Sequence, residues 1–150
     1  MAYFEWADDM VIDNGPIDKD HQILVRQVNE LHTATSEGRG HEVVGRLLDE
    51  LIRDTVEHIR REEQEMARMG YPRLVQHKQG HDQFVADLQG LQRKFEGGSS
   101  TVASQLSTVL RDWLSLHIRR YDKEMVGFIR QKNRQSRPAA RARRPKALLN

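Results

Sequence analysis

Histidines and carboxylates occur in this sequence about one helical turn apart. Three pairs have this spacing: His58 and Glu62, His77 and His81, and His117 and Asp122. Side chains four residues apart point in nearly the same direction from an α-helix. Imidazole and carboxylate are good ligands for iron, zinc, manganese and copper. The pattern therefore predicts a transition-metal site inside a helical protein, and His21 is a further candidate ligand before the first apolar run.

The third pair does not fit an ideal α-helix, because residues five apart lie roughly 140° apart around the axis. Glu124, seven residues after His117, is the better partner by this geometry alone. Asp122 would fit if the helix widened into a π-helical turn, which is common at functional sites. The spacing leaves both carboxylates open. His32 and His41 lack a partner at ligand spacing, and we interpret them as surface or capping residues.

The sequence contains no cysteine, which excludes disulfides, thiolate zinc sites, thiolate-held iron–sulfur clusters and cysteine nucleophiles. Any bound metal must therefore use nitrogen and oxygen ligands.

Four segments carry apolar residues at alternating spacings of three and four, which is typical of amphipathic helices. The expected helices cover residues 18–37, 41–68, 73–95 and 101–131, with glycines or proline between them. Four such helices with short connections favour an all-α, antiparallel up-down-up-down four-helix bundle. Residues 1–16 are expected to form an irregular N-terminal arm, and Asp18 to cap the first helix.

The third segment places His77 and His81 on the same face as Leu74, Phe84 and Leu88. Two imidazoles are thus expected where the core should be. A buried polar group without a partner costs about 1–3 kcal/mol. Metal coordination would remove this cost, so the placement favours a metal site over ordinary core histidines.

The chain has 150 residues and a formal charge of +2, which suits one domain. Residues 130–150 hold eight basic residues and no acidic one. Residues 1–129 hold the other 16 of the 24 basic residues and all 22 acidic residues, which gives this part of the chain a formal charge of −6. We therefore divide the chain into a bundle domain, 1–130, and a basic disordered tail, 131–150.

The tail is a candidate for binding a polyanion or an acidic partner. It lacks aromatic residues for base stacking, so nucleic-acid binding is not expected. No apolar stretch is long enough to span a bilayer, and the acidic N-terminus lacks the pattern of a secretory signal. We expect a cytoplasmic, monomeric protein.

Together these residues resemble the hemerythrins, especially the single-domain bacteriohemerythrins. The resemblance covers residues 4–129 and is carried by these motifs: Phe4 and Trp6, Ile17-Asp18-x-x-His21-Gln22, His58-x-x-x-Glu62-Glu63-x-x-Met66, Gly70-Tyr71-Pro72, His77-x-x-x-His81-x-x-Phe84 and Trp113-Leu114-x-x-His117-Ile118-x-x-x-Asp122. The residue after His58 is commonly phenylalanine in this family and is Ile59 here, which changes a wall beside the site.

The resemblance implies a non-haem centre of two iron ions with an oxo or hydroxo group between them. It assigns His77, His81 and His117 to one iron, His21 and His58 to the other, and Glu62 and Asp122 to both as bridges. It thereby selects Asp122 over Glu124. The second iron has one ligand fewer, and O2 is expected at that open position. The expected O2 pocket is formed by Ile59, Trp113, Leu114 and Ile118.

The expected function is reversible O2 binding for carriage, storage or sensing, without enzymatic activity. Five neutral imidazoles donate less negative charge than carboxylates, which favours binding of O2 over its activation. One alternative is a di-iron enzyme with peroxidase-like, oxidase or nitric-oxide-handling activity. Another is a binding module that responds to oxygen or iron and acts through a partner.

Overall fold

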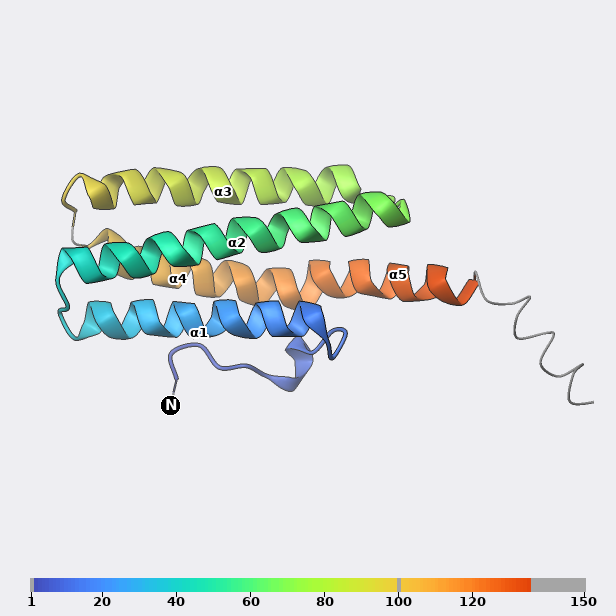
Figure 1. Ribbon diagram of the computed structural model, residues 1–150, viewed down its shortest axis with the longest axis horizontal. Helices are drawn as coiled ribbons and strands as arrows, with labels where there is room; N and C mark the ends of the chain where they lie inside the picture. The colour runs from blue at the N-terminus through green and yellow to red at the C-terminus, as the bar shows by residue number, and fades with distance from the viewer. Residues whose placement is uncertain (1, 100, 136–150) are drawn as a thin grey trace, which may run out of the picture.

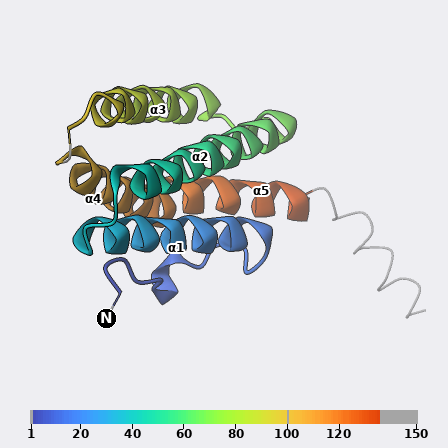
Figure 2. The same ribbon diagram turned by 60° about the vertical axis from the view of Figure 1, so that its left-hand side comes forward.

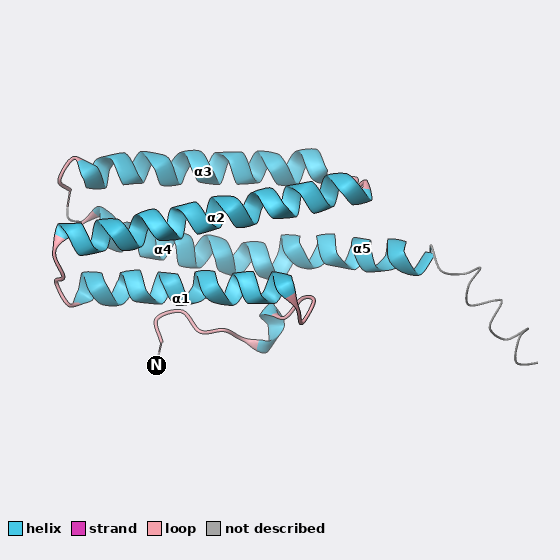
Figure 3. Ribbon diagram, viewed as in Figure 1, coloured by secondary structure: helices cyan, strands magenta, loops and turns pink. Residues whose placement is uncertain are grey.

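The computed structural model describes residues 2–99 and 101–135, and all its regular elements are helical (Figure 3). They are a 3-10 helix, Asp8–Met10, then α1 (Pro16–Ser36), α2 (His41–Met69), α3 (Leu74–Glu96), α4 (Val102–Leu116), a π-helical segment, His117–Asp122, and α5 (Lys123–Gln135). The described part of the chain contains no strand.

The helices form an antiparallel bundle, in which α1 and α3 run opposite to α2 and to the helix built from α4 and α5 (Figure 1). Helix α1 packs against α2 and α4, and α3 packs against the same two helices. The turned view shows the same arrangement (Figure 2). The predicted all-α, up-down-up-down four-helix bundle is therefore confirmed. None of the described helices is long and apolar enough to cross a membrane.

The core lies where the apolar faces of the helices meet. One aliphatic residue from each of α1, α2, α3 and α4 illustrates this core, because it is fully buried: Val28, Leu48, Leu88 and Leu110. Burial of such a side chain stabilises the fold by about 1.5–3 kcal/mol. These residues belong to the stripes that the apolar spacing predicts, which is why the helix positions could be inferred from sequence.

The start of α1 differs from the prediction, because Asp13 caps the helix and Asp18 does not. Asp13 accepts hydrogen bonds from the backbone N–H groups of Gly15, Ile17 and Asp18 at 2.9, 3.0 and 3.1 Å. Pro16 occupies the first helical turn, a position that its fixed φ favours, so the helix begins two residues earlier than expected. The buried Asp18 instead accepts N–H groups of the preceding arm.

The N-terminal arm is irregular, as predicted, and lies along the bundle (Figure 1). Phe4 is buried, and its backbone N–H and C=O both bond to the Asn29 side chain, at 2.7 and 2.8 Å. Tyr3 contacts Thr108 of α4 through hydroxyl oxygens 2.9 Å apart. The arm therefore packs on α1 and α4.

The last helix is longer than the sequence suggested. It continues to Gln135, so residues 131–135 are helical and not part of an irregular tail as predicted. The Lys132 ammonium donates a hydrogen bond of 2.5 Å to the backbone carbonyl of Met69 at the end of α2. A polar contact of this kind leaves no apolar pattern in the sequence. The remainder of the predicted tail, 136–150, lies outside the described residues.

Candidate metal centre

The seven predicted ligand residues come together in the interior of the bundle, with their side chains at most 6% exposed. They come from all four arms: His21 from α1, His58 and Glu62 from α2, His77 and His81 from α3, and His117 and Asp122 from the π-helical segment. Their donor atoms form two groups that could each hold a metal ion, one with three histidines and one with two.

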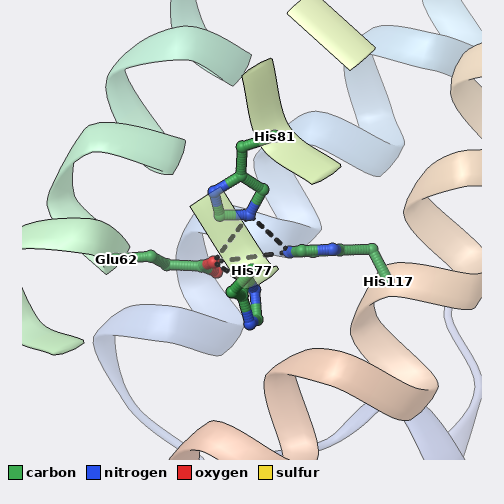
Figure 4. Close-up of side chains that lie close together, drawn as sticks. All are labelled: Glu62, His77, His81 and His117. Carbon is green, nitrogen blue, oxygen red and sulfur yellow. Dashed lines mark hydrogen bonds and ion pairs between the residues drawn. The ribbon is translucent and has the colours of Figure 1, made fainter. Parts of the chain in front are cut away.

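The three-histidine group consists of His77, His81 and His117 with Glu62 (Figure 4). The Nε2 atoms of these histidines lie 3.9, 3.6 and 3.4 Å from Glu62 Oε1, in that order. The Nε2 atoms of His81 and His117 are only 3.1 Å apart. Three imidazole nitrogens and one carboxylate oxygen thus converge on a single point.

The two-histidine group consists of His21 and His58 with both carboxylates. The Nε2 atoms of the histidines are 2.9 Å apart. Glu62 Oε2 lies 2.6 Å from His58 Nε2 and 3.5 Å from His21 Nε2. This group has one imidazole fewer than its neighbour.

Both carboxylates stand between the two groups. Glu62 directs Oε1 to the three-histidine group and Oε2 to the two-histidine group. Asp122 behaves in the same way: its Oδ1 lies 2.7 Å from His117 Nε2 and 3.5 Å from His77 Nε2, and its Oδ2 lies 3.0 Å from His21 Nε2. Carboxylates placed in this way can bridge two metal ions.

The π-helical segment decides which carboxylate of the fourth arm enters the site. It begins at His117 and ends at Asp122, and the widened turn brings residues five apart to the same side. Glu124, the partner favoured by the ideal helix, has a side chain 45% exposed and contacts Arg73 at 3.4 Å. It lies outside the donor groups, in agreement with the family resemblance.

A second layer of acids holds two of the histidines from behind. His58 Nδ1 and Asp20 Oδ2 are 3.1 Å apart, and Arg61 donates to the same oxygen at 2.9 Å. His81 Nδ1 and Glu63 Oε2 are 2.9 Å apart. Such contacts fix the ring so that Nε2 faces a metal. Asp20 and Glu63 were missed in the sequence, because the contacts join different helices and only their position next to ligand candidates marks them.

The charges of the site are balanced by protons in the metal-free protein. Burial lowers the pKa of His58, but the charge of Glu62 and the close contacts with Asp20 and Glu62 raise it to about 10. Burial likewise lowers the pKa of His117, and the charge of Asp122 raises it to about 9. Burial and the nearby His117 charge lower the pKa of His81 to about 4. Burial lowers the pKa of His21 too, but its contacts with Asp122 and Glu62 raise it above its ordinary value. Protonated histidines thus face two ionised carboxylates.

The same charges hold the carboxylates in the ionised form that binds metal. Burial and Glu62 raise the pKa of Asp122, but His117 and His21 lower it, to about 2. Burial raises the pKa of Glu62, and the surrounding histidines bring it well below its ordinary value. Metal ions could replace the imidazolium protons without leaving the carboxylates unbalanced.

The donor set fits a metal for a second reason. Several buried polar atoms of the site have no hydrogen bond of good geometry among the described residues, although imidazole nitrogens lie 2.6–3.0 Å from three of them. Such atoms are costly unless an ion satisfies them. These atoms are Glu62 Oε2, His77 Nε2, Asp122 Oδ1 and Asp122 Oδ2. All of them point into the two donor groups, and all are of the nitrogen or oxygen type expected in a chain without cysteine.

The residues predicted to form an O2 pocket have two kinds of position. Ile59, Leu114 and Ile118 are buried in the apolar core. Trp113 stacks on His117 with ring centroids 4.3 Å apart and lines a surface hollow beside the three-histidine group. A different hollow of about 500 Å³ reaches His58 and Glu62 of the two-histidine group, and it is lined by none of these four residues.

His32 and His41 stay out of the site, as the sequence indicated. His32 stacks on Tyr3 with ring centroids 3.7 Å apart, and His41 stacks on Phe95 at 4.2 Å. Both histidines contribute to packing at the bundle surface.

An antiparallel four-helix bundle with two adjacent histidine–carboxylate groups in its interior is typical of helical metal-binding proteins. The chain belongs to the hemerythrin family: the model of the hemerythrin HHE cation binding domain matches residues 15–129. This match covers all seven donor residues and nearly the whole described bundle.

Individual relatives agree with this assignment. A bacteriohemerythrin of Methylococcus capsulatus is 36% identical over 124 residues, which cover 82% of this chain and 94% of the relative. A bacteriohemerythrin of Pseudomonas aeruginosa is 32% identical over 130 residues, 87% of this chain and 84% of the relative.

Solved structures also include close neighbours of this fold. A hemerythrin mutant with a leucine replaced by alanine superposes with a TM-score of 0.77 at 31% identity, over 85% of this chain and 98% of that chain. A second mutant, with a leucine replaced by phenylalanine, gives a TM-score of 0.74 at 32% identity. The resemblance recognised in the sequence is thus confirmed.

Proposed function

We propose that the protein binds O2 reversibly at a non-haem centre of two iron ions. In this proposal His77, His81 and His117 hold one iron, and His21 and His58 hold the other. Glu62 and Asp122 bridge them.

The observation that carries the proposal is the orientation of Glu62 and Asp122. Each carboxylate directs one oxygen to each histidine group, at 2.6–3.4 Å from the nearest Nε2 atom. A single metal ion would leave one oxygen of each carboxylate without a cation, buried in the core. Two ions satisfy all four oxygens, which supports a dinuclear centre.

The unequal groups support a site for a small ligand. One iron would have five protein ligands, three histidines and the two bridging carboxylates. The other iron would have only four, two histidines and the same two carboxylates. The less coordinated side has room for an exogenous ligand. When bound, a ferrous pair would supply the electrons with which O2 is held reversibly. The protein's part is to hold this pair in a buried, largely apolar interior that excludes bulk water.

Binding is favoured over catalysis by the positions of the nearby acids. Glu62 and Asp122 serve as metal ligands in this proposal. Asp20 and Glu63 contact the outer nitrogens of His58 and His81, so neither is free to act as a general acid or base on a bound substrate. Membership in a family of bacteriohemerythrins agrees with an O2-binding function.

Iron analysis and visible spectroscopy test this proposal. We expect two irons per chain, and we expect the reduced protein to develop a coloured O2 adduct that disappears on deoxygenation. Repeated cycles should return the same spectrum.

The His77→Ala variant, which removes one ligand of the three-histidine group, serves as the control and should lose iron and the adduct together. Rapid, irreversible oxidation of the parent protein with substrate turnover would contradict O2 carriage and favour an enzyme.

A further inference from the structure

A hollow of about 490 Å³ opens at the surface beside the three-histidine group, between α3 and the helix formed by α4 and α5. We call it the α3–α4 pocket. Its volume lies within the roughly 300–1,000 Å³ of small-molecule sites, and its lining is more apolar than polar, as is usual for them. The pocket adjoins the three-histidine group, whereas O2 is proposed to bind at the two-histidine group.

Aromatic rings line the α3–α4 pocket. Trp113 stacks between Phe84 and His117, with ring centroids 3.8 and 4.3 Å away. Tyr121 lies 6.1 Å from both His77 and His117. Both faces of Trp113 are covered by this stack, so an aromatic ligand would meet its edge, and it could pack on Tyr121 in the offset or edge-to-face arrangements that such pairs prefer.

Apolar side chains are exposed at the rim of this pocket. Leu116 is 54% exposed and Tyr121 is 41% exposed, and both line the hollow. Large apolar side chains grouped on a surface mark places where a ligand or partner is bound. Because Leu116 and Tyr121 border a pocket and do not form a flat face, we expect a small ligand at this place.

The polar groups at the rim select an uncharged ligand with a hydroxyl group. Arg73 Nη1 and Glu124 Oε2 are 3.4 Å apart, so the two opposite charges offset each other. A hydroxyl can accept a hydrogen bond from the guanidinium and donate one to the carboxylate. A charged ligand would gain attraction to one of these residues and repulsion from the other.

Gly80 leaves one wall of the pocket open. It lies in α3, and a Cβ atom added there would have no heavy atom within 4 Å. Gly80 also lines the pocket, so its missing side chain leaves room there. A large side chain at this position would occupy that space without displacing the core.

We propose that the α3–α4 pocket binds small, uncharged aromatic alcohols of the phenol class. The aromatic ring packs against Tyr121 and the edge of Trp113, and the hydroxyl lies at the Arg73–Glu124 pair. The occupant contacts the three-histidine group from the solvent side. Neither histidine of the two-histidine group, which is proposed to receive O2, lines this pocket, so ligand binding here does not depend on O2 binding.

Phenol is the probe for the test, with cyclohexanol as a non-aromatic alcohol of similar size. Their dissociation constants are measured by ligand-observed NMR on the full chain with its metal content determined. Gly80→Trp fills the pocket, and Gly80→Ala changes the same position without filling it. Gly127 is an exposed helical glycine that also has open space around its Cβ position but does not line the pocket, so Gly127→Trp is the matched control.

We expect phenol to bind the parent, Gly80→Ala and Gly127→Trp proteins alike, and cyclohexanol to bind more weakly. Gly80→Trp should weaken phenol binding at least tenfold. Tyr121→Ala, which removes a wall instead of filling space, should also weaken it. Equal phenol binding by the parent and Gly80→Trp would overturn the proposal, as would equal loss in Gly127→Trp or equal binding of cyclohexanol and phenol.

Discussion

Replacement of Asp122 by alanine should disrupt the metal centre, whereas replacement of Glu124 should leave it nearly intact. Asp122 is fully buried, and its oxygens lie 2.7 Å from His117 and 3.0 Å from His21. Removal of the Asp122 carboxylate leaves both buried imidazoles without this partner, and each lost contact costs about 1–3 kcal/mol. We therefore expect the free energy of unfolding to fall by about 2–6 kcal/mol. The variant should also hold fewer than two irons.

Glu124 provides the matched control. Its contact with Arg73 joins side chains that are 45% and 69% exposed. Exposed ion pairs contribute about 0–1 kcal/mol, so Glu124→Ala should lower the melting temperature by no more than about 4 °C. Iron content should remain at two per chain.

The assay combines iron determination on purified protein with thermal and denaturant unfolding of both variants. The reasoning is refuted if Glu124→Ala loses iron and Asp122→Ala retains it, because the fourth arm would then follow an ideal helix. Two irons per chain in both variants would show that neither carboxylate is needed as a bridge.

Three further perturbations test other parts of the structure. Asp20→Asn, which weakens the contact behind His58, should reduce metal affinity about 10–100-fold in a competition titration with a chelator. Leu114→Ala, at a side chain only 1% exposed, should cost about 2–5 kcal/mol in denaturant unfolding, and autoxidation followed by visible absorbance should accelerate as water enters; an unchanged rate would remove Leu114 from the O2 pocket. Asp13→Ala should cost about 0.5–2 kcal/mol at neutral pH through loss of the helix cap. Burial raises the pKa of Asp13, but backbone N–H donors bring it below its ordinary value of 3.8. The cap therefore stabilises above this pH, and the difference from the parent should vanish as the pH falls through the lowered pKa; a constant difference from pH 7 to pH 3 would contradict it.

The sequence by itself determined the helices and most of the candidate ligands. The apolar period of three and four predicts each arm of the bundle, and it works because each helix buries one face against its neighbours. His77 and His81 could be recognised as site residues because they occupy that apolar face. Their chemistry followed from residue type, since without cysteine only imidazole and carboxylate remain as metal ligands.

Contacts between helices could not be read from local spacing. Spacing on a single helix left Asp122 and Glu124 open, and motif resemblance was needed to choose between them. Only the tertiary structure places a π-helical turn there and shows Asp122 facing His21 of another helix. Asp20 and Glu63 escaped notice for the same reason, because each contacts a histidine on a different helix.

The tertiary structure also decided the ends of the elements. Asp13 caps α1 because Pro16 starts the helix early, and α5 is extended where Lys132 reaches the carbonyl of Met69. The α3–α4 pocket likewise exists only where two helices and the turn before α3 come together. A sequence pattern records which face of a helix is buried, but hydrogen bonds and hollows between distant segments depend on how those faces are packed.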